Sequence, residues 1–110
     1  MEIVEQGTVG TDTYIKYADG RMEQEIYVDF ININFNASSV PYSSFATSIS
    51  FVKPFINKPL ITPLVIEHVG AWFGGIDYDN RIIKGIYMQC IISGIVPKIK
   101  TCLKISGYWK

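Results

Sequence analysis

A short segment in the second half of the chain gathers side chains that could bind a sugar. It combines aromatic rings with carboxylate, amide and guanidinium groups, on Trp72, Asp77, Tyr78, Asp79, Asn80 and Arg81. Sugars present C–H faces that pack on aromatic rings and hydroxyls that need polar partners, so this mixture suits a saccharide site. The same mixture also occurs in ordinary loops, where a tryptophan can simply close the end of a β-sandwich. The sequence predicts a loop over residues 70–80 and leaves both roles open.

Chemistry beyond binding finds little support in the sequence. The chain has one histidine, His68, and lacks the metalloprotease, serine-hydrolase and phosphate-loop motifs. Residues 77–80 match a calcium loop only loosely, because the glycine and the distant glutamate of such a loop are missing. We therefore expect a protein that is not an enzyme and that uses no metal and no cofactor.

The charges are balanced in number but not in position. Ten basic and ten acidic residues give a formal net charge of zero, which argues against nucleic acid as a partner. Every acidic residue lies at or before Asp79, whereas Arg81 and five lysines follow it. One interpretation is that basic C-terminal strands pair with acidic N-terminal strands. The other is a basic face that binds an anionic polymer.

The elements that must position these residues are strands. Ile, Val, Tyr, Phe and Thr dominate, turn residues recur at short intervals, and no amphipathic helix is evident, which together favour an all-β chain. We predict a single domain, an antiparallel β-sandwich of about six strands over residues 13–110, preceded by a lead-in over residues 1–12. No signal peptide and no membrane span are expected, because neither a charged leader with an apolar core nor a sufficiently long apolar run is present.

The pair Asp19-Gly20 predicts the first hairpin. A two-residue loop there would place Tyr17 opposite Met22 and Lys16 opposite Glu23, with Ile15 and Tyr17 on the same face as Met22. In the strand that follows, the hydrophobic residues change phase, which predicts a bulge or a sharp bend near Phe30.

The segment 60–69 is apolar on both faces and contains Pro63, which predicts an edge strand or a bulge. Burial of both faces in so small a domain would require contact with another subunit. His68 falls on the same strand parity as Leu64 and Ile66, so we expect it to be packed or interfacial.

Two cysteines, Cys90 and Cys102, would face each other in a hairpin centred on Val96. Matching the apolar faces of the two strands requires a shift of one residue, and this shift sends the sulfurs to opposite sides of the sheet. We predict free thiols, an argument that weakens if an oligomer buries both faces.

Three segments resemble, in their order, the C-terminal domain of bacteriophage tail-fibre and baseplate proteins, a group similar to H-type lectins. They are "TYIKYADGRM" at residues 13–22, "FATSISFVKPFINKPLITP" at 45–63 and "ISGYWK" at 105–110. The resemblance implies a six-stranded sandwich that forms a homotrimer at the fibre tip and recognises host-surface carbohydrate. It also implies that Trp109 and Lys110 end a strand packed into the domain.

Three functions follow as expectations. The first is a receptor-binding tip domain of a phage tail, made in the bacterial cytoplasm and carried on the virion, that attaches to a bacterial surface glycan through residues 72–81. The second is a structural knob that trimerises and registers the fibre. The third is a cell-wall-targeting module of a lysin, which would differ from the first mainly in what lies upstream.

Overall fold

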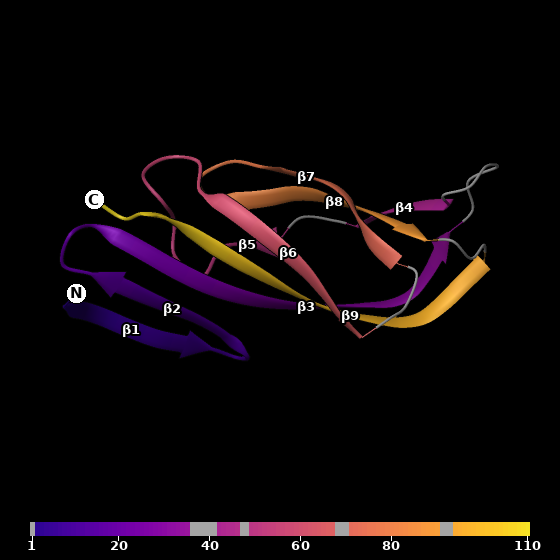
Figure 1. The fold of residues 1–110 in the computed structure, drawn as a ribbon, viewed down its shortest axis with the longest axis horizontal. Coiled ribbons are helices and arrows are strands. Elements are labelled where there is room, and N and C mark those ends of the chain that lie inside the picture. The colour runs from indigo at the N-terminus through magenta and orange to yellow at the C-terminus, as the bar shows by residue number, and fades with distance from the viewer. Residues whose placement is uncertain (1, 36–41, 47–48, 68–70, 91–93) are drawn as a thin grey trace.

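The structure is a computed structural model that describes residues 2–35, 42–46, 49–67, 71–90 and 94–110. Within these ranges the chain forms antiparallel strands and no helix. The strands are β1 (Ile3–Val9), β2 (Asp12–Tyr17), β3 (Arg21–Phe35), β4 (Tyr42–Ala46), β5 (Ile49–Ser50), β6 (Leu60–Glu67), β7 (Ala71–Tyr78), β8 (Ile82–Cys90) and β9 (Gly94–Tyr108). The domain is elongated, with extents of 48 × 22 × 19 Å, and both chain ends lie towards one end of the long axis (Figure 1).

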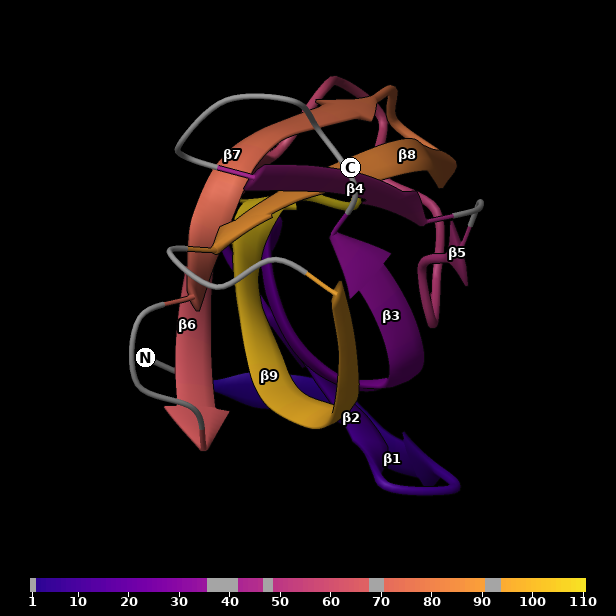
Figure 2. The same ribbon diagram turned by 90° about the vertical axis from the view of Figure 1, so that its right-hand side faces the viewer.

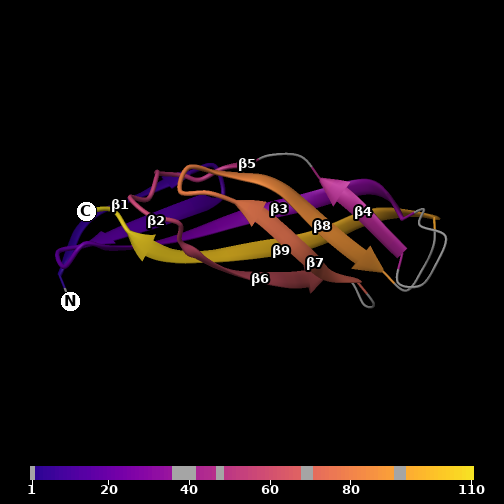
Figure 3. The same ribbon diagram turned by 90° about the horizontal axis from the view of Figure 1, so that it is seen from above.

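The strands form two sheets. Five strands pair in the order β1-β2-β3-β9-β6, and β8 pairs with β4 and β5 along one edge and with β7 along the other. Viewed along the long axis, β4, β7 and β8 lie over the curved β3–β9 pair (Figure 2). Seen from above, β8 crosses the direction of β9 at an angle (Figure 3). The predicted all-β, antiparallel, sandwich-like fold is confirmed, with more strands than the six expected.

The core lies between β3 and β9 on one side and β8 on the other. Alternate residues of β3 and β9 point into it, as the period of two in a strand requires. In β8 the alternation shifts between Ile83 and Ile86, where the pairing with β7 is irregular. The buried members of the core include Met22, Ile26 and Phe30 of β3, Ile99, Leu103 and Ile105 of β9, and Ile83, Ile86 and Met88 of β8. The segment between β5 and β6 adds Phe51 and Phe55, whose rings meet edge to face with centroids 5.4 Å apart.

The β3–β9 pair explains the uneven distribution of charge along the chain. Glu25 lies opposite Lys104 and Asp29 opposite Lys100, and Asp29 also lies 3.8 Å from the Lys98 ammonium. Acidic β3 and basic β9 therefore pair directly, as the first interpretation of the charge pattern expects.

Of the two alternatives predicted near Phe30, the bulge does not form in the pairing of β3 with β9. β3 keeps one register with β9 along its whole length, from Arg21 opposite Tyr108 to Phe35 opposite Gly94. At the change of hydrophobic phase, Phe30 is buried and the next hydrophobic residue, Ile31, is 61% exposed.

The first hairpin forms where predicted but in a different register. Lys16 lies opposite Met22 and Ile15 opposite Glu23, one residue away from the predicted pairing. The loop has three residues: the Gly20 N–H donates to the Tyr17 carbonyl, and Gly20 adopts φ +97°, the conformation of a turn closed by a left-handed residue. Tyr14 and Lys16, rather than Ile15 and Tyr17, therefore share the face of Met22.

Residues expected as a lead-in contain a strand. β1 pairs with β2 from Ile3 to Val9 through a tight turn at Gly10, which has φ +64°. The Tyr14 hydroxyl donates to Glu5 over 2.6 Å, which lowers the pKa of that carboxyl below its ordinary value. The missing alternation of β1 has a physical reason, since most of its side chains are exposed and its partner β2 is covered only in part.

The edge position predicted from Pro63 is confirmed. β6 is the last strand of its sheet, and its register shifts between Val65 and Glu67. One of its faces turns outward, leaving Leu60 74%, Leu64 43% and Ile66 53% exposed.

The predicted pairing of the two cysteine-bearing strands is wrong, because β8 and β9 belong to different sheets. Cys102 is a buried free thiol, as predicted, and burial raises its pKa. The Cys90 side chain and His68 fall outside what the structure describes.

Candidate functional site

The segment predicted as a binding loop is mostly a strand. β7 runs from Ala71 to Tyr78 and only residues 79–81 form the turn into β8. Because a strand rises about 3.3 Å per residue, Trp72 and Tyr78 lie roughly 20 Å apart, more than the length of one sugar ring. The structure thus separates Trp72 from the residues that follow the strand, and the six candidates do not form one site.

The side chains on β7 have separate surroundings. The Trp72 indole is 38% exposed, and its Nε1–H donates to Gln89 Oε1 over 2.8 Å. Asp77 is exposed. The Tyr78 hydroxyl donates to the Pro59 carbonyl over 2.8 Å, and its ring packs against the core. Tyr78 is therefore a structural residue.

The turn after β7 is built by Asp79 and Asn80. Asp79 Oδ1 accepts the backbone N–H groups of Arg81 and Ile82 at 2.7 and 2.9 Å. These hydrogen bonds lower the pKa of the Asp79 carboxyl. Asn80 Nδ2 donates to the Phe55 carbonyl over 2.8 Å, and the Phe55 N–H donates to the Asn80 carbonyl over 2.9 Å. The turn is thus fixed on itself and on the segment before β6.

The same turn forms one side of a shallow groove, which we call the Arg81 groove, with a volume of about 550 Å³. Its lining residues are Ser50, Phe51, Pro54, Phe55, Ile56, Asn80, Arg81, Ile82 and Trp109. The groove therefore joins an exposed guanidinium, an amide and a hydroxyl to an apolar floor. This is the mixture that the sequence predicts for a saccharide site, with Trp109 in the place expected for Trp72.

The floor of the groove is held from three sides. The buried Gln24 side chain accepts the Val52 N–H through Oε1 at 2.9 Å and donates through Nε2 to the Lys53 carbonyl at 2.7 Å. The Phe51 N–H donates to the Arg81 carbonyl, and the Ile56 N–H donates to the Tyr108 carbonyl. These bonds fix an irregular segment against both sheets, so the groove is formed before any ligand arrives.

The resemblance to tail-fibre domains implies only a structural role for Trp109. Its backbone N–H donates to the Gly20 carbonyl and its Nε1–H to the Tyr17 carbonyl, at 2.8 and 3.1 Å. These contacts support that role, while the half-buried ring also lines the Arg81 groove. No signal in the sequence could join Trp109 to Arg81, because contact across two sheets depends on the tertiary fold.

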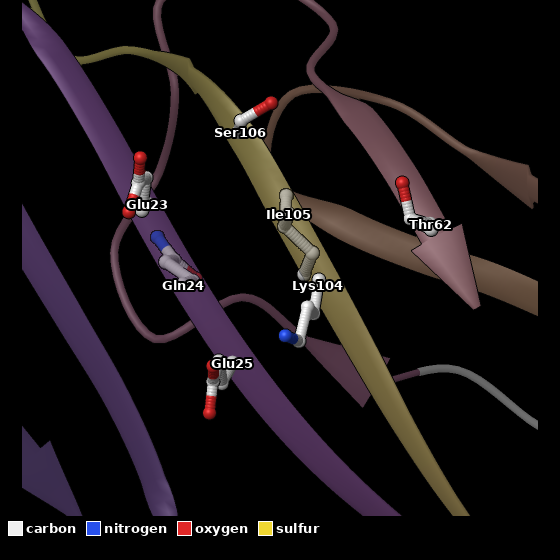
Figure 4. Close-up of a pocket in the computed structure, with 7 residues that line it drawn as sticks. All are labelled: Glu23, Gln24, Glu25, Thr62, Lys104, Ile105 and Ser106. Carbon is white, nitrogen blue, oxygen red and sulfur yellow. The ribbon is translucent and has the colours of Figure 1, made fainter. Parts of the chain in front are cut away.

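A second depression, which we call the outer-face hollow, lies on the side of the five-stranded sheet that faces away from the core (Figure 4). Its volume is about 290 Å³. Glu23 and Glu25 project from β3, Lys104 and Ser106 from β9, and Thr62 from β6. Lys104 extends towards β3, so the hollow mixes both signs of charge.

Comparisons with known proteins give no relative: no family model, curated protein or solved structure matches the chain. The described residues contain no cluster of three or more histidine, cysteine or acidic side chains that could hold a metal ion. The described part of the chain also holds no helix with the length and apolar character that a membrane crossing needs.

Proposed function

We propose that this domain binds carbohydrate and that the Arg81 groove is the binding site. The observation that carries the proposal is the meeting in one groove of the Arg81 guanidinium, the Ser50 hydroxyl and the apolar side chains of Phe51 and Trp109. A sugar can place C–H groups on such apolar walls while its hydroxyls bond to polar groups at the rim. The elongated all-β fold is compatible with this function, although a fold alone does not fix one.

In the cell, we propose, the domain serves as the receptor-recognition tip of a phage or phage-derived tail and attaches to a bacterial surface glycan. The support is the resemblance of residues 13–22, 45–63 and 105–110 to tail-fibre domains. Three copies on one fibre would convert weak binding at single sites into useful avidity.

The site is tested by filling each depression in turn. Ser50 in the Arg81 groove and Ser106 in the outer-face hollow are both exposed residues on strands, so a large side chain can be placed at either position. Ser50→Trp should abolish binding to a panel of immobilised bacterial glycans, and Ser106→Trp should retain it. Thermal melting of both variants checks that each one folds.

The outcomes separate the claims. If the unmodified domain binds no glycan on a broad panel, the proposed function is wrong. If Ser106→Trp removes binding and Ser50→Trp does not, carbohydrate binding stands but the site is the outer-face hollow. Trp72→Ala is a third variant: because Trp72 lies at the far end of β7, it should leave binding unchanged.

A second candidate function is a trimerising knob that registers the fibre, with self-association as its essential activity. The exposed apolar row on edge strand β6, formed by Leu60, Leu64 and Ile66, favours it. Mass measurement in solution should find a trimer, and Leu60→Lys combined with Leu64→Lys should dissociate it. A stable monomer at micromolar concentration would count against this function.

A further inference from the structure

The charges around the Arg81 groove point to a particular class of ligand. Arg81 is exposed, and its neighbour Asp79 is already engaged by two backbone N–H groups and lies 3.9 Å from the Lys84 ammonium. Within the described part of the chain, the ion pairs with an N–O distance of 4.0 Å or less involve other cations. The charge of Arg81 contributes to the lowered pKa of Asp79, but the guanidinium forms no direct ion pair with that carboxylate. A guanidinium presents a planar fork of N–H donors that matches a carboxylate or phosphate.

The Trp109 wall of the groove adds further positive charge. The Lys16 and Lys110 ammonium groups each lie 5.0 Å from the Trp109 ring centroid, within range of a cation–π contact. Lys16 also lies 3.7 Å from Glu5, so its charge is partly balanced. Arg81 in the lining and Lys110 beside the Trp109 ring are thus two cations on this side of the groove.

Two polar side chains at the rim of the groove also offer hydrogen-bonding atoms to a ligand. Asn80 uses its Nδ2 group to hold Phe55, which leaves its side-chain oxygen to accept a sugar hydroxyl. Ser50 is exposed and offers a hydroxyl that can donate or accept. The groove thus has one strong donor fork for an anion, with weaker partners for hydroxyl groups beside it.

We infer that the Arg81 groove selects an anionic saccharide and holds the carboxylate or phosphate group of the sugar on the Arg81 guanidinium. This inference rests on the proposed function and names its class of ligand. The outer-face hollow would disfavour the same ligand, because two glutamates and one lysine line it. Selection by charge would also weaken as salt is added, since the cations are exposed.

The test compares an acidic polysaccharide with its uncharged ester and with a phosphate polymer. Polygalacturonic acid and its methyl ester have the same sugar backbone, and only the first is an anion; polyglycerol phosphate has a glycerol backbone and supplies phosphate in place of carboxylate. We expect the domain to bind the acid about tenfold more tightly than the ester at low salt, as a charge-assisted bidentate contact implies.

Two variants with the same change in net charge isolate Arg81. Arg81→Gln should bring the affinity for polygalacturonic acid down to that for the ester. Lys98→Gln, which removes an exposed cation paired with Asp29 outside the groove, should keep the preference. Melting curves of both variants confirm that they fold.

Each remaining outcome decides a separate claim. Equal binding of the acid and the ester, or a preference that survives Arg81→Gln, overturns the inference and leaves carbohydrate binding in place. Failure to bind any glycan overturns the proposed function itself. If single-stranded DNA binds as tightly as the acidic polysaccharides, the groove recognises charged chains in general, and selection of a saccharide is wrong.

Discussion

The Arg81 groove and the outer-face hollow differ in where their charged side chains come from: the hollow is lined by residues of paired strands, and the groove takes Arg81 from a turn. In the hollow, Glu25 of β3 and Lys104 of β9 are register partners, so strand pairing places opposite charges next to each other. In the groove, Arg81 projects from a turn whose carboxylate is bound to backbone N–H groups. A charged side chain on a paired strand can face an opposite charge on the neighbouring strand. A charged side chain on a turn can remain available for a ligand.

The largest loss of stability should come from replacing Gln24, which lies on β3 between residues of the hollow and hydrogen-bonds to the floor of the groove. Its neighbours Glu23 and Glu25 line the hollow, while its own amide, 2% exposed, holds the floor of the groove. Gln24→Leu keeps the volume but leaves the Val52 N–H and the Lys53 carbonyl without partners, so the free energy of unfolding should fall by about 2–4 kcal/mol. Urea denaturation measures the change.

The neighbouring position supplies the control for Gln24. Glu23→Gln alters an exposed side chain of the hollow and should change the free energy of unfolding by less than about 0.5 kcal/mol. If Gln24→Leu and Glu23→Gln lowered the free energy of unfolding equally, the buried hydrogen bonds of Gln24 would not be what holds the floor of the groove.

A second effect should come from the close packing of the groove floor on β9. A Cβ atom at Gly107 would lie 2.8 Å from Cδ1 of Phe55 and 3.0 Å from Cβ of Pro59. Phe55 is 2% exposed and cannot move aside easily, so Gly107→Ala should lower the free energy of unfolding by about 1–3 kcal/mol through overpacking.

A glycine with open space around it serves as the matched control for Gly107. A Cβ atom at Gly75 of β7 would meet no atom within 4 Å, and its φ is not in the left-handed region. Gly75→Ala should therefore be nearly neutral in denaturation. A loss at Gly75 as large as that at Gly107 would mean that chain entropy or strand geometry, and not contact with Phe55, sets the effect.

Sequence patterns predicted the parts of the fold that depend on local residue preferences. The dominance of β-branched and aromatic residues correctly predicted an all-β chain, and Pro63 correctly placed β6 at an edge. The predicted register of the first hairpin was wrong by one residue, because Asp19-Gly20 suits both a two-residue loop and a three-residue loop closed by Gly20. Turn chemistry alone does not distinguish the two loops.

The candidate site shows the same limit more clearly. Residues 77–81 lay close in sequence to Trp72, and sequence reasoning therefore treated them as one loop. The structure instead brings Asn80 and Arg81 to Trp109 and to residues 50–56, contacts that span both sheets. These residues are far apart in the sequence and come together only through tertiary packing. The spacing of residues could therefore indicate the chemistry of the binding site but not which residues line it.

The smallest change in stability should come from replacing Asp79. This replacement tests whether the hydrogen bonds of Asp79 to the backbone of the turn hold the groove in shape. The pKa of the Asp79 carboxyl is lowered in the folded protein, so the ionised form stabilises the fold. This contribution is complete above the ordinary value of 3.8 and is lost as the pH falls through the lower folded pKa. Thermal melting in acid should therefore show a loss in the unmodified domain that is smaller in Asp79→Asn, whose side-chain oxygen still accepts the same N–H groups.

Binding measured on these two proteins and on Asp79→Ala separates the hydrogen bonds of Asp79 from its charge. Asp79→Ala removes both hydrogen bonds to the turn and should weaken glycan binding, while Asp79→Asn should preserve it, because Arg81 keeps its backbone position. In acid, binding of polyglycerol phosphate should fall in the unmodified domain before it falls in Asp79→Asn. A parallel fall in both would mean that protonation of another group limits binding, and Asp79 would then support the fold of the turn without controlling the groove.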